Sequence, residues 1–443
     1  MIKVLIPSGA LGLKYDRGAL ANGLAANPDI IAIDGGSTDS GPSYLGQGIS
    51  KYSRASTKAE WRDLMIARAQ IDVPLLIGSA GTCGADSAVD WLLEITRELA
   101  SELDQSLTVA VLKSGQPAAR VKSALGGDQI TPLAPKVPID APLIDDCTNI
   151  VALAGAEQIQ AALDTGADIV IAGRTTDTAV IAALPLARGC HAGAAWHGAK
   201  IGECGALATT NPNAGTIMIT FDAQGFTVTP MADEGQATPR SVSAHMLYEN
   251  SNPFVLYEPG GHLNVEGATY VAKGRSTHVT GSVWVPNDTY TVKLEGARRV
   301  GFQTVSLTLV RDPRYVAHVE QWLALIRDDI LEPVQEDDFV VEFRLIGQNA
   351  TLGDLETRSI GAGEIGVMTI VTANEQSRAT EIAKLLNPAL LHYPLTPDEP
   401  MPTFAFPFSP AEIERGAHYE FCLNHVITLD DPMEAFALEV IEI

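Results

Sequence analysis

The sequence is poor in basic residues: 30 Lys and Arg stand against 54 Asp and Glu among 443 residues, which gives a formal charge of −24 at pH 7. Diffuse negative charge of this size disfavours binding to nucleic acid and to anionic membrane surfaces, because both require basic patches. We therefore expect neither nucleic acid nor a membrane as a partner. A small anionic substrate would need a pocket that is basic locally.

Long apolar runs and recognisable metal signatures are also missing. No uninterrupted run of about 18 apolar residues indicates a transmembrane helix, and a Gly-rich turn directly follows the apolar start MIKVLI, which is typical of a first strand and not of a signal peptide. The five cysteines have scattered spacings without a CxxC pair or a Cys/His cluster, which indicates reduced thiols and no zinc signature. The sequence thus predicts a cytoplasmic protein.

Three common catalytic signatures are absent or incomplete. There is no GxxxxGK[ST] for P-loop phosphoryl transfer and no GxSxG nucleophile elbow. The segment from Gly9 to Gly12 supplies half of a GxGxxG fingerprint, and Asp34 follows where an acid that binds a ribose would lie. A nucleotide- or CoA-binding oxidoreductase or transferase therefore stays open as an alternative function.

The sequence repeats one pattern: an apolar strand, a loop of Gly, Ser, Thr and Asp, and a helix-like segment. Full copies occupy residues 29–42, 74–89 and 168–181, and a shorter relative occupies residues 4–11. Continuous apolar strands are typical of parallel sheets that are buried on both faces. Because loops at the carboxyl ends of such strands gather in one crevice, they predict a ligand site.

Alternating strands and helices predict a doubly wound, mostly parallel, Rossmann-like α/β domain over residues 1–212. An α+β domain with antiparallel strands is expected at 213–390, including a hairpin at 216–231. Residues 391–443 are expected to form a Pro-rich linker and a small C-terminal tail that packs on the domains.

Two helices carry further expectations. In residues 57–70 we expect Thr57 to be the N-cap of a helix, with Glu60 completing a capping box. A helix at 241–249 would place His245 and Glu249 four residues apart on one face, as proton-transfer partners or as an ordinary docked helix.

The repeated loops supply the other candidate residues. Asp34 and Asp39 flank a Gly-rich turn and are candidate general bases, although Asp39 could simply cap the next segment. The loop GSAGTCGAD can hold an anion with its amides, or can be a tight turn that Asp86 caps. Arg174 suits a bidentate grip on a carboxylate, or a structural ion pair with Asp177. The predicted catalytic residues are Asp34, Asp39, His245 and Glu249, and the predicted substrate-binding residues are Gly35, Gly36, Ser37, Thr38, Ser79, Ala80, Gly81, Thr82, Asp86, Arg54, Arg174, Thr175 and Asp177.

The segment GRTTDTA and the run ATPRSVSAHMLYENSNPF, followed by EPGG, are similar to those of the acyclic terpene utilisation family AtuA. The resemblance covers roughly residues 1–375 and is most specific at 238–261. It implies a Rossmann-like domain followed by an α+β domain, an enzyme of carboxylate or acyl-CoA catabolism, and a small extra domain or second subunit. The loops GGSTDSG and GSAGTCGAD differ from the patterns of the terpene-pathway members, which favours a different substrate.

We therefore expect a lyase, hydratase or double-bond isomerase that abstracts a proton next to a carboxylate or a CoA thioester. Arg174 and the amides near Ser79 would hold the acidic group, Asp34 or Asp39 would be the base, and His245 or Glu249 the acid. No cofactor is required, while Mg²⁺ and a CoA-linked substrate stay open. We expect a homo-oligomer, and a non-catalytic subunit of a larger complex is a further alternative.

Overall fold

The computed structural model describes residues 1–334, 337–358 and 361–443. These residues form two compact units. The first unit comprises Met1–Arg298 and Phe421–Ile443, and the second comprises Arg299–Glu420. Two long strands, β15 (Tyr290–Val310) and β18 (Ile413–Leu429), each contain one of the boundaries.

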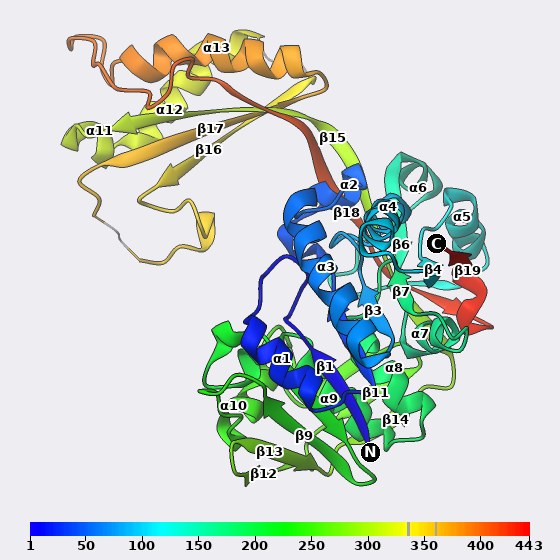
Figure 1. The fold of residues 1–443 in the computed structure, drawn as a ribbon. Helices are drawn as coiled ribbons and strands as arrows, with labels where there is room; N and C mark the ends of the chain where they lie inside the picture. Colours follow the sequence, from blue (N-terminus) through cyan, green and yellow to red (C-terminus); the bar gives the residue numbers. More distant parts are fainter. Residues whose placement is uncertain (335–336, 359–360) are drawn as a thin grey trace. The chain divides into compact units, whose positions relative to one another are not determined.

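A ten-stranded sheet organises the first unit, in the order β12-β13-β9-β8-β1-β2-β3-β7-β4-β19 (Figure 1). The five central strands β1, β2, β3, β7 and β4 are parallel, and antiparallel strands flank them on both sides. This sheet, together with the antiparallel sheets described below, confirms the predicted fold class. The strand bounds are β1 Ile2–Ile6, β2 Ile30–Asp34, β3 Leu75–Gly78, β4 Thr108–Lys113, β7 Ile169–Ala172, β8 Ile217–Phe221, β9 Gly225–Pro230, β12 Thr269–Lys273, β13 Ser276–Thr280 and β19 Ala437–Glu442.

Helices cover both faces of the parallel strands because the chain reverses its direction of travel across the sheet. From β1 through β2 and β3 to β4, each new strand is added in the same direction across the sheet, so right-handed crossovers place their helices on one face. The connection from β4 to β7 runs in the opposite direction, so its helix lies on the other face. Alternate β2 residues enter the two cores: Ile31 packs in the core of Trp61, and Ala32 in the core of Trp196. Helices α1 (Arg17–Ala25), α3 (Arg54–Ile71) and α4 (Asp86–Leu103) lie on the first face, and α7 (Ala156–Leu163), α8 (Ala179–Ala187) and α9 (Ala192–Gly202) on the second.

Helix α3 begins earlier than the sequence analysis predicted. Ser53 is its N-cap, with an extended backbone and a side-chain oxygen that accepts from the Ser56 amide at 3.2 Å. Thr57 is buried inside the helix, so the predicted Thr57 cap is wrong. Glu60 accepts instead from the Gly12 amide at 2.7 Å, which ties α3 to the loop after β1.

The predicted helix at 241–249 is also shorter than expected. The α-helix α10 spans Pro239–Ala244, and a 3₁₀ turn, His245–Leu247, follows it. Glu249 adopts a left-handed backbone with φ of 57°, outside any helix. His245 and Glu249 therefore do not share a helix face.

The hairpin predicted at 216–231 is confirmed as β8 and β9, and β8 pairs antiparallel with β1. The change of composition near residue 212 consequently lies inside the first unit. A small antiparallel sheet, in the order β10-β11-β14, follows along the chain. Further elements of this unit are β5 Ile130–Pro132, β6 Cys147–Ala152, β10 Val255–Glu258, β11 Gly261–Asn264, β14 Val283–Pro286, α2 Ser43–Gln47, α5 Ala118–Gly126 and α6 Ala141–Asp146.

The second unit is an antiparallel sheet with helices packed on it. Its strands follow the order β16-β17-β15-β18, where β16 is Phe339–Ile346 and β17 is Ile365–Ala373. Apolar residues of β17, such as Val367, form one core with Trp322 and Leu386 of the helices. The helices are α11 Pro313–Ala317, α12 Val319–Ile326 and α13 Gln376–His392.

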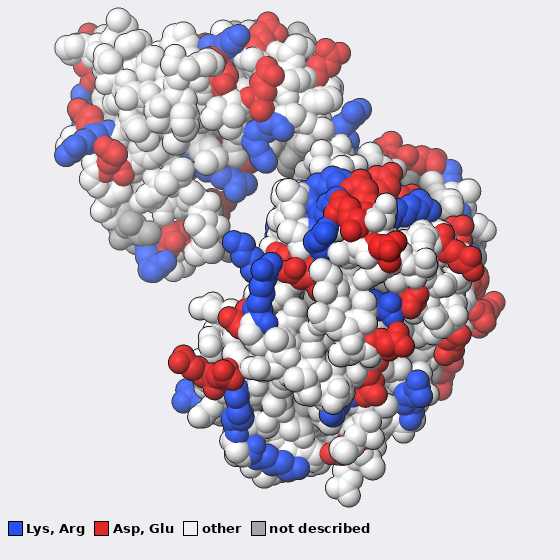
Figure 2. All heavy atoms as spheres, viewed as in Figure 1, with Lys and Arg blue, Asp and Glu red and all other residues white. Residues whose placement is uncertain are grey.

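Ion pairs cover the outer surface of α3 and α4, where Figure 2 shows basic and acidic side chains intermixed. Lys58 bonds both Glu98 and Glu102 of α4, at 2.9 and 2.6 Å, and Arg54 bonds Glu98. Exposed pairs of this kind contribute at most about 1 kcal/mol each. Among the described helices, none combines the length and the apolar character that crossing a bilayer requires.

The C-terminal tail supplies the edge strand β19, which pairs antiparallel with β4 from Ala437 opposite Lys113 to Glu442 opposite Thr108. Deleting residues 437–443 would leave the β4 edge unpaired and uncover the apolar surface under Ile441. We expect the free energy of unfolding to fall by at least about 2 kcal/mol, measured in urea. Ile441→Asp should be destabilising, whereas Val440→Asp, at an exposed site, should be close to neutral. Equal effects of the two substitutions would contradict this role for β19.

Candidate functional site

Two adjoining pockets lie at the carboxyl ends of β2 and β7, as the repeated loop pattern predicts. The first pocket has a volume of about 760 Å³ and the second about 510 Å³. Ser37, Asp39, Asp177, Glu203 and Glu249 line both pockets. The pockets therefore form one connected candidate site in the first unit.

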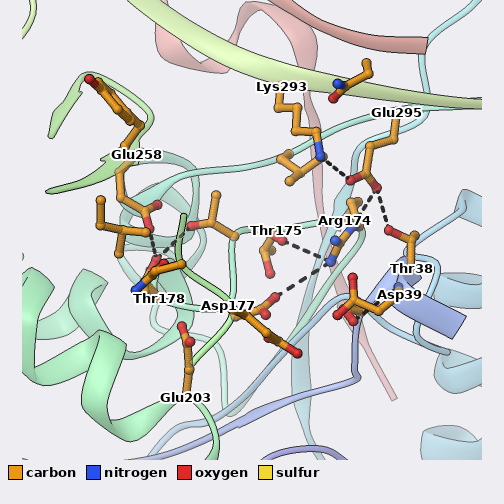
Figure 3. A pocket seen from close by; sticks show the side chains of 18 of the residues that line it. Thr38, Asp39, Arg174, Thr175, Asp177, Thr178, Glu203, Glu258, Lys293 and Glu295 are labelled. Atoms are coloured by element: carbon orange, nitrogen blue, oxygen red, sulfur yellow. Dashed lines mark hydrogen bonds and ion pairs between the residues drawn. The ribbon is translucent and has the colours of Figure 1, made fainter. Parts of the chain in front are cut away.

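Arg174 is at the centre of a buried ionic network in the first pocket. It follows β7, is 5% exposed, and donates from Nε to Glu295 Oε2 at 3.1 Å and from Nη1 to Ser79 Oγ at 2.9 Å. Its distance to Asp177 Oδ1 is 3.7 Å. Glu295, in β15, also accepts from Lys293 Nζ at 2.9 Å and from the Thr38 hydroxyl at 3.1 Å (Figure 3).

This network fixes the charge of Glu295. Burial alone would raise the pKa of Glu295, but the charges of Arg174 and Lys293 outweigh burial and lower it to about 2. Glu295 is therefore ionised at neutral pH and neutralises Arg174. The predicted alternative of a structural ion pair for Arg174 is thus present, with Glu295 as the closer partner. Lys293, whose side chain is 39% exposed, is the more accessible cation in this pocket.

Glu258 lies on the opposite side of the first pocket in Figure 3. It ends β10, is 9% exposed, and accepts from the Thr178 hydroxyl through Oε1. Its Oε2 is buried without a hydrogen-bond partner among the described residues. Burial raises the pKa of Glu258 to about 7, against the effect of the hydroxyls of Thr178 and Thr176, which lower it.

Two acids that lie between Glu258 and the Arg174 network, Asp177 and Glu203, also have raised pKa values. Burial raises the pKa of Asp177, and the nearby Arg174 and Lys200 offset this in part. Burial likewise raises the pKa of Glu203 to about 8, although Lys200 is bonded to it. One pocket thus holds Glu295, which stays ionised, beside Glu258 and Glu203, whose pKa values lie near neutrality, an arrangement that is typical of acid–base sites.

Asp34 lies in the second pocket, at the end of β2, and is 7% exposed. Its Oδ1 is buried without a partner among the described residues. Burial and the charge of Asp177 raise the pKa of Asp34 well above its ordinary value, against the effect of Arg174. Thr82 lines the same pocket with φ of 77°, a strained conformation for a β-branched residue that is typical of functional loops.

The structure brings most of the predicted residues to these pockets. Both pockets contain Ser37, Asp39, Asp177 and Glu249; the first contains Thr38, Arg174 and Thr175; the second contains Asp34, Gly36 and Thr82. The others line neither pocket: Gly35, Arg54, Ser79, Ala80, Gly81, Asp86 and His245.

The residues outside the pockets have structural contacts of their own. Arg54 pairs with Glu98 on the surface of α3, and Asp86 accepts from the Gly115 amide at 2.9 Å while Ala85 occupies the N-cap position of α4. A side chain at Gly35 would place its Cβ 2.2 Å from the carbonyl oxygen of Ser79. Glycine is needed there for close packing between the loops after β2 and β3.

Sequence reasoning missed Lys293, Glu295, Lys200 and Glu203, and included Glu258 only in the EPGG segment that carries the family resemblance. Lys293 and Glu295 are two residues apart in a strand, and the period of two directs such side chains to one face. That alternation was a usable signal within the predicted antiparallel region. No local pattern indicates that Glu295 meets Arg174, 121 positions away in the sequence.

The first unit belongs to the class of doubly wound α/β proteins, in which ligand sites generally lie at the carboxyl ends of the strands, where these two pockets are. The sequence matches the family described as acyclic terpene utilisation family protein AtuA over residues 65–396, and the chain belongs to this family. The match confirms the resemblance found at GRTTDTA and at 238–261. No curated protein and no solved structure matches the chain.

Proposed function

We propose that this protein is an enzyme of small-molecule carboxylate catabolism that moves a proton next to a carboxylate or a CoA thioester, as a lyase, hydratase or double-bond isomerase. The family name is compatible with a catabolic role. The observation that carries the proposal is the pair of opposed walls in the first pocket: Glu258 with a free buried oxygen on one, and the Arg174–Glu295–Lys293 network on the other.

The cationic wall would hold the acidic group of the substrate. Lys293 is the accessible cation there, and its Nζ can bond an incoming carboxylate while still contacting Glu295. Arg174 would contribute its positive charge without bonding the substrate through Nε or Nη1, since both atoms already bond other residues of the protein. A substrate held in this way would extend across the pocket toward Glu258.

Glu258 would act as the general base through Oε2. A carboxyl with a pKa near 7 can both accept and return a proton at neutral pH, which is the optimum for general acid–base catalysis. Its Oε2 would take the proton from the carbon next to the acidic group, and the electron pair of the broken C–H bond would form the double bond. A hydroxyl group on the adjacent carbon would leave as water.

The proton for that leaving group would come from Asp177, which lies between the two walls and whose pKa is raised. In this proposal Glu258 and Asp177 take the roles that the sequence analysis gave to Asp34 or Asp39 and to His245 or Glu249. His245 is replaced because it lines neither pocket. The hydroxyls of Thr38 and Thr175 can orient a hydroxy acid.

The nucleotide- or CoA-binding alternative depends on the second pocket, which Gly9 and Asp34 both line. The glycine at position 12 is explained by packing against the Tyr52 ring, because a Cβ there would lie 2.6 Å from that ring. Gly12 is therefore no indication of a dinucleotide in this pocket. A thermal-shift titration with NAD(P), adenine nucleotides and CoA esters separates this alternative from the first. Use of Mg²⁺ or CoA, homo-oligomerisation and a small second subunit stay predictions.

The proposed reaction can be tested by NMR in D₂O with a panel of small hydroxy- and unsaturated di- and tricarboxylates, each as the free acid and as the CoA ester. We expect at least one acid to exchange its α-proton or to be converted. Glu258→Gln should lower that rate by about 10²- to 10⁴-fold, because the base is lost and the shape is kept.

Glu266→Gln, at an exposed site outside both pockets, is the matched control and should retain the rate. Exchange at the original rate in Glu258→Gln would refute the assignment of the base. The absence of exchange and conversion across the panel would refute the lyase and isomerase proposal as a whole.

A further inference from the structure

Beside the pockets, three side chains with metal-ligating atoms converge. Glu203, Cys204 and His245 each place one ligand atom within 4.8 Å of the other two, and they are the one such group among the described residues. Glu203 and Cys204 follow directly after α9, and His245 begins the 3₁₀ turn after α10. The acids Asp34, Asp39 and Asp177, which lie at or after the carboxyl ends of β2 and β7, do not form such a group.

His245 gives the second, independent indication of a ligand. It is 5% exposed, and its Nε2 is buried without a hydrogen-bond partner among the described residues. A buried imidazole nitrogen that is left unbonded costs about 1–3 kcal/mol, so such atoms normally have a partner. A metal ion would provide that partner without any change in the fold.

We propose that Glu203, Cys204 and His245 bind a divalent transition-metal ion of the Zn²⁺ type. A thiolate and an imidazole select a borderline-soft ion, whereas Mg²⁺ and Ca²⁺ prefer sets made of oxygen alone. Ligands at 2.0–2.3 Å from a tetrahedral Zn²⁺ lie roughly 3.5 Å from each other. Small side-chain rotations therefore close the group around an ion, and the Cys204 thiol releases its proton to solvent on binding.

Lys200 does not exclude the ion from this site. Its ammonium group bonds Oε1 of Glu203, and the carboxylate retains a second oxygen for the metal. Three protein ligands leave a fourth position open, as in catalytic zinc sites. Because Glu203 lines both pockets and Cys204 lines the second, that position can take a water molecule or a hydroxyl or carboxylate oxygen of a small acid.

The site can be tested with Co²⁺, which substitutes for Zn²⁺ and gives a thiolate-to-metal charge-transfer band. After chelator treatment, we expect the full-length protein to bind about one Co²⁺ per chain with this band, and Zn²⁺ to displace it. Cys204→Ser should abolish the band, and His245→Gln should weaken binding by at least about 10-fold. Near-UV circular dichroism without metal checks that each variant is folded.

Cys190→Ser and His262→Gln are the matched controls, because both residues lie outside the group. They should keep the band and the affinity. A band that persists in Cys204→Ser, or an affinity in His245→Gln equal to that of the controls, would overturn the proposal, as would a folded protein that binds no Co²⁺. These readouts do not depend on the proposed reaction, so the metal site and the function can fail separately.

Discussion

Arg174→Met is expected to lower the free energy of unfolding of the first unit by about 3–5 kcal/mol, because it leaves Glu295 ionised and buried without the buried cation that neutralises it. Lys293 remains, but its ammonium group is at the rim and compensates only partly. The measurement is urea unfolding followed by tryptophan fluorescence. A Trp322→Phe background, used for every protein compared, leaves only the four tryptophans of the first unit as reporters.

Two further variants test the cause of this loss. Arg62→Met, which removes a surface pair with Glu102, should cost less than about 1 kcal/mol. The double variant Arg174→Met/Glu295→Met should be more stable than Arg174→Met alone, since no buried charge is left without a partner. If the free energy of unfolding of the double variant falls by the sum of the losses in Arg174→Met and in Glu295→Met, each measured alone, the ion pair does not explain the stability.

The parts of the fold that the sequence predicts well are the parts whose signals are local. Strand β7, at Ile169–Ala172, lies where the third copy of the repeated pattern, at residues 168–181, predicts an apolar strand. Helix boundaries were less certain where two capping residues compete. Ser53 and Thr57 are both residue types that cap helices; the structure uses Ser53, and Glu60 bonds Gly12, which is far away in the sequence.

In the candidate site, too, some positions follow from local sequence signals and others depend on contacts between distant segments. The loops after β2 and β7 reach one edge of the sheet by the geometry of parallel strands, so Asp34, Asp39 and Arg174 could be placed there from the sequence. The residues that determine the ionisation of these side chains could not be predicted from the sequence. Glu295 comes from β15, and Glu258 gains its raised pKa from burial, which no local pattern records.

The pH dependence of stability provides a direct test of the state of Glu258. The pKa of Glu258 is about 7 in the folded protein and about 4.5 when unfolded. Between these values the folded protein keeps a proton that the unfolded chain has lost, so this group makes stability fall as pH rises, by about 1.4 kcal/mol per pH unit. Below pH 4.5 both states are protonated, and above pH 7 both are ionised, so its contribution is constant in each range.

Glu258→Gln removes this titration and leaves the other groups in place. The stability of Glu258→Gln minus that of the unsubstituted protein should therefore increase by about 3 kcal/mol from pH 4.5 to pH 7. The effect of Glu295 is common to both proteins and cancels in the difference, whereas Glu203 adds to the increase above pH 7, because the charge of Glu258 raises the pKa of Glu203. The control Glu266→Gln should give a flat difference. A flat difference for Glu258→Gln as well would mean that Glu258 ionises as it does in water, and the pocket would then lack a base whose pKa is matched to neutral pH, which the proposed chemistry uses.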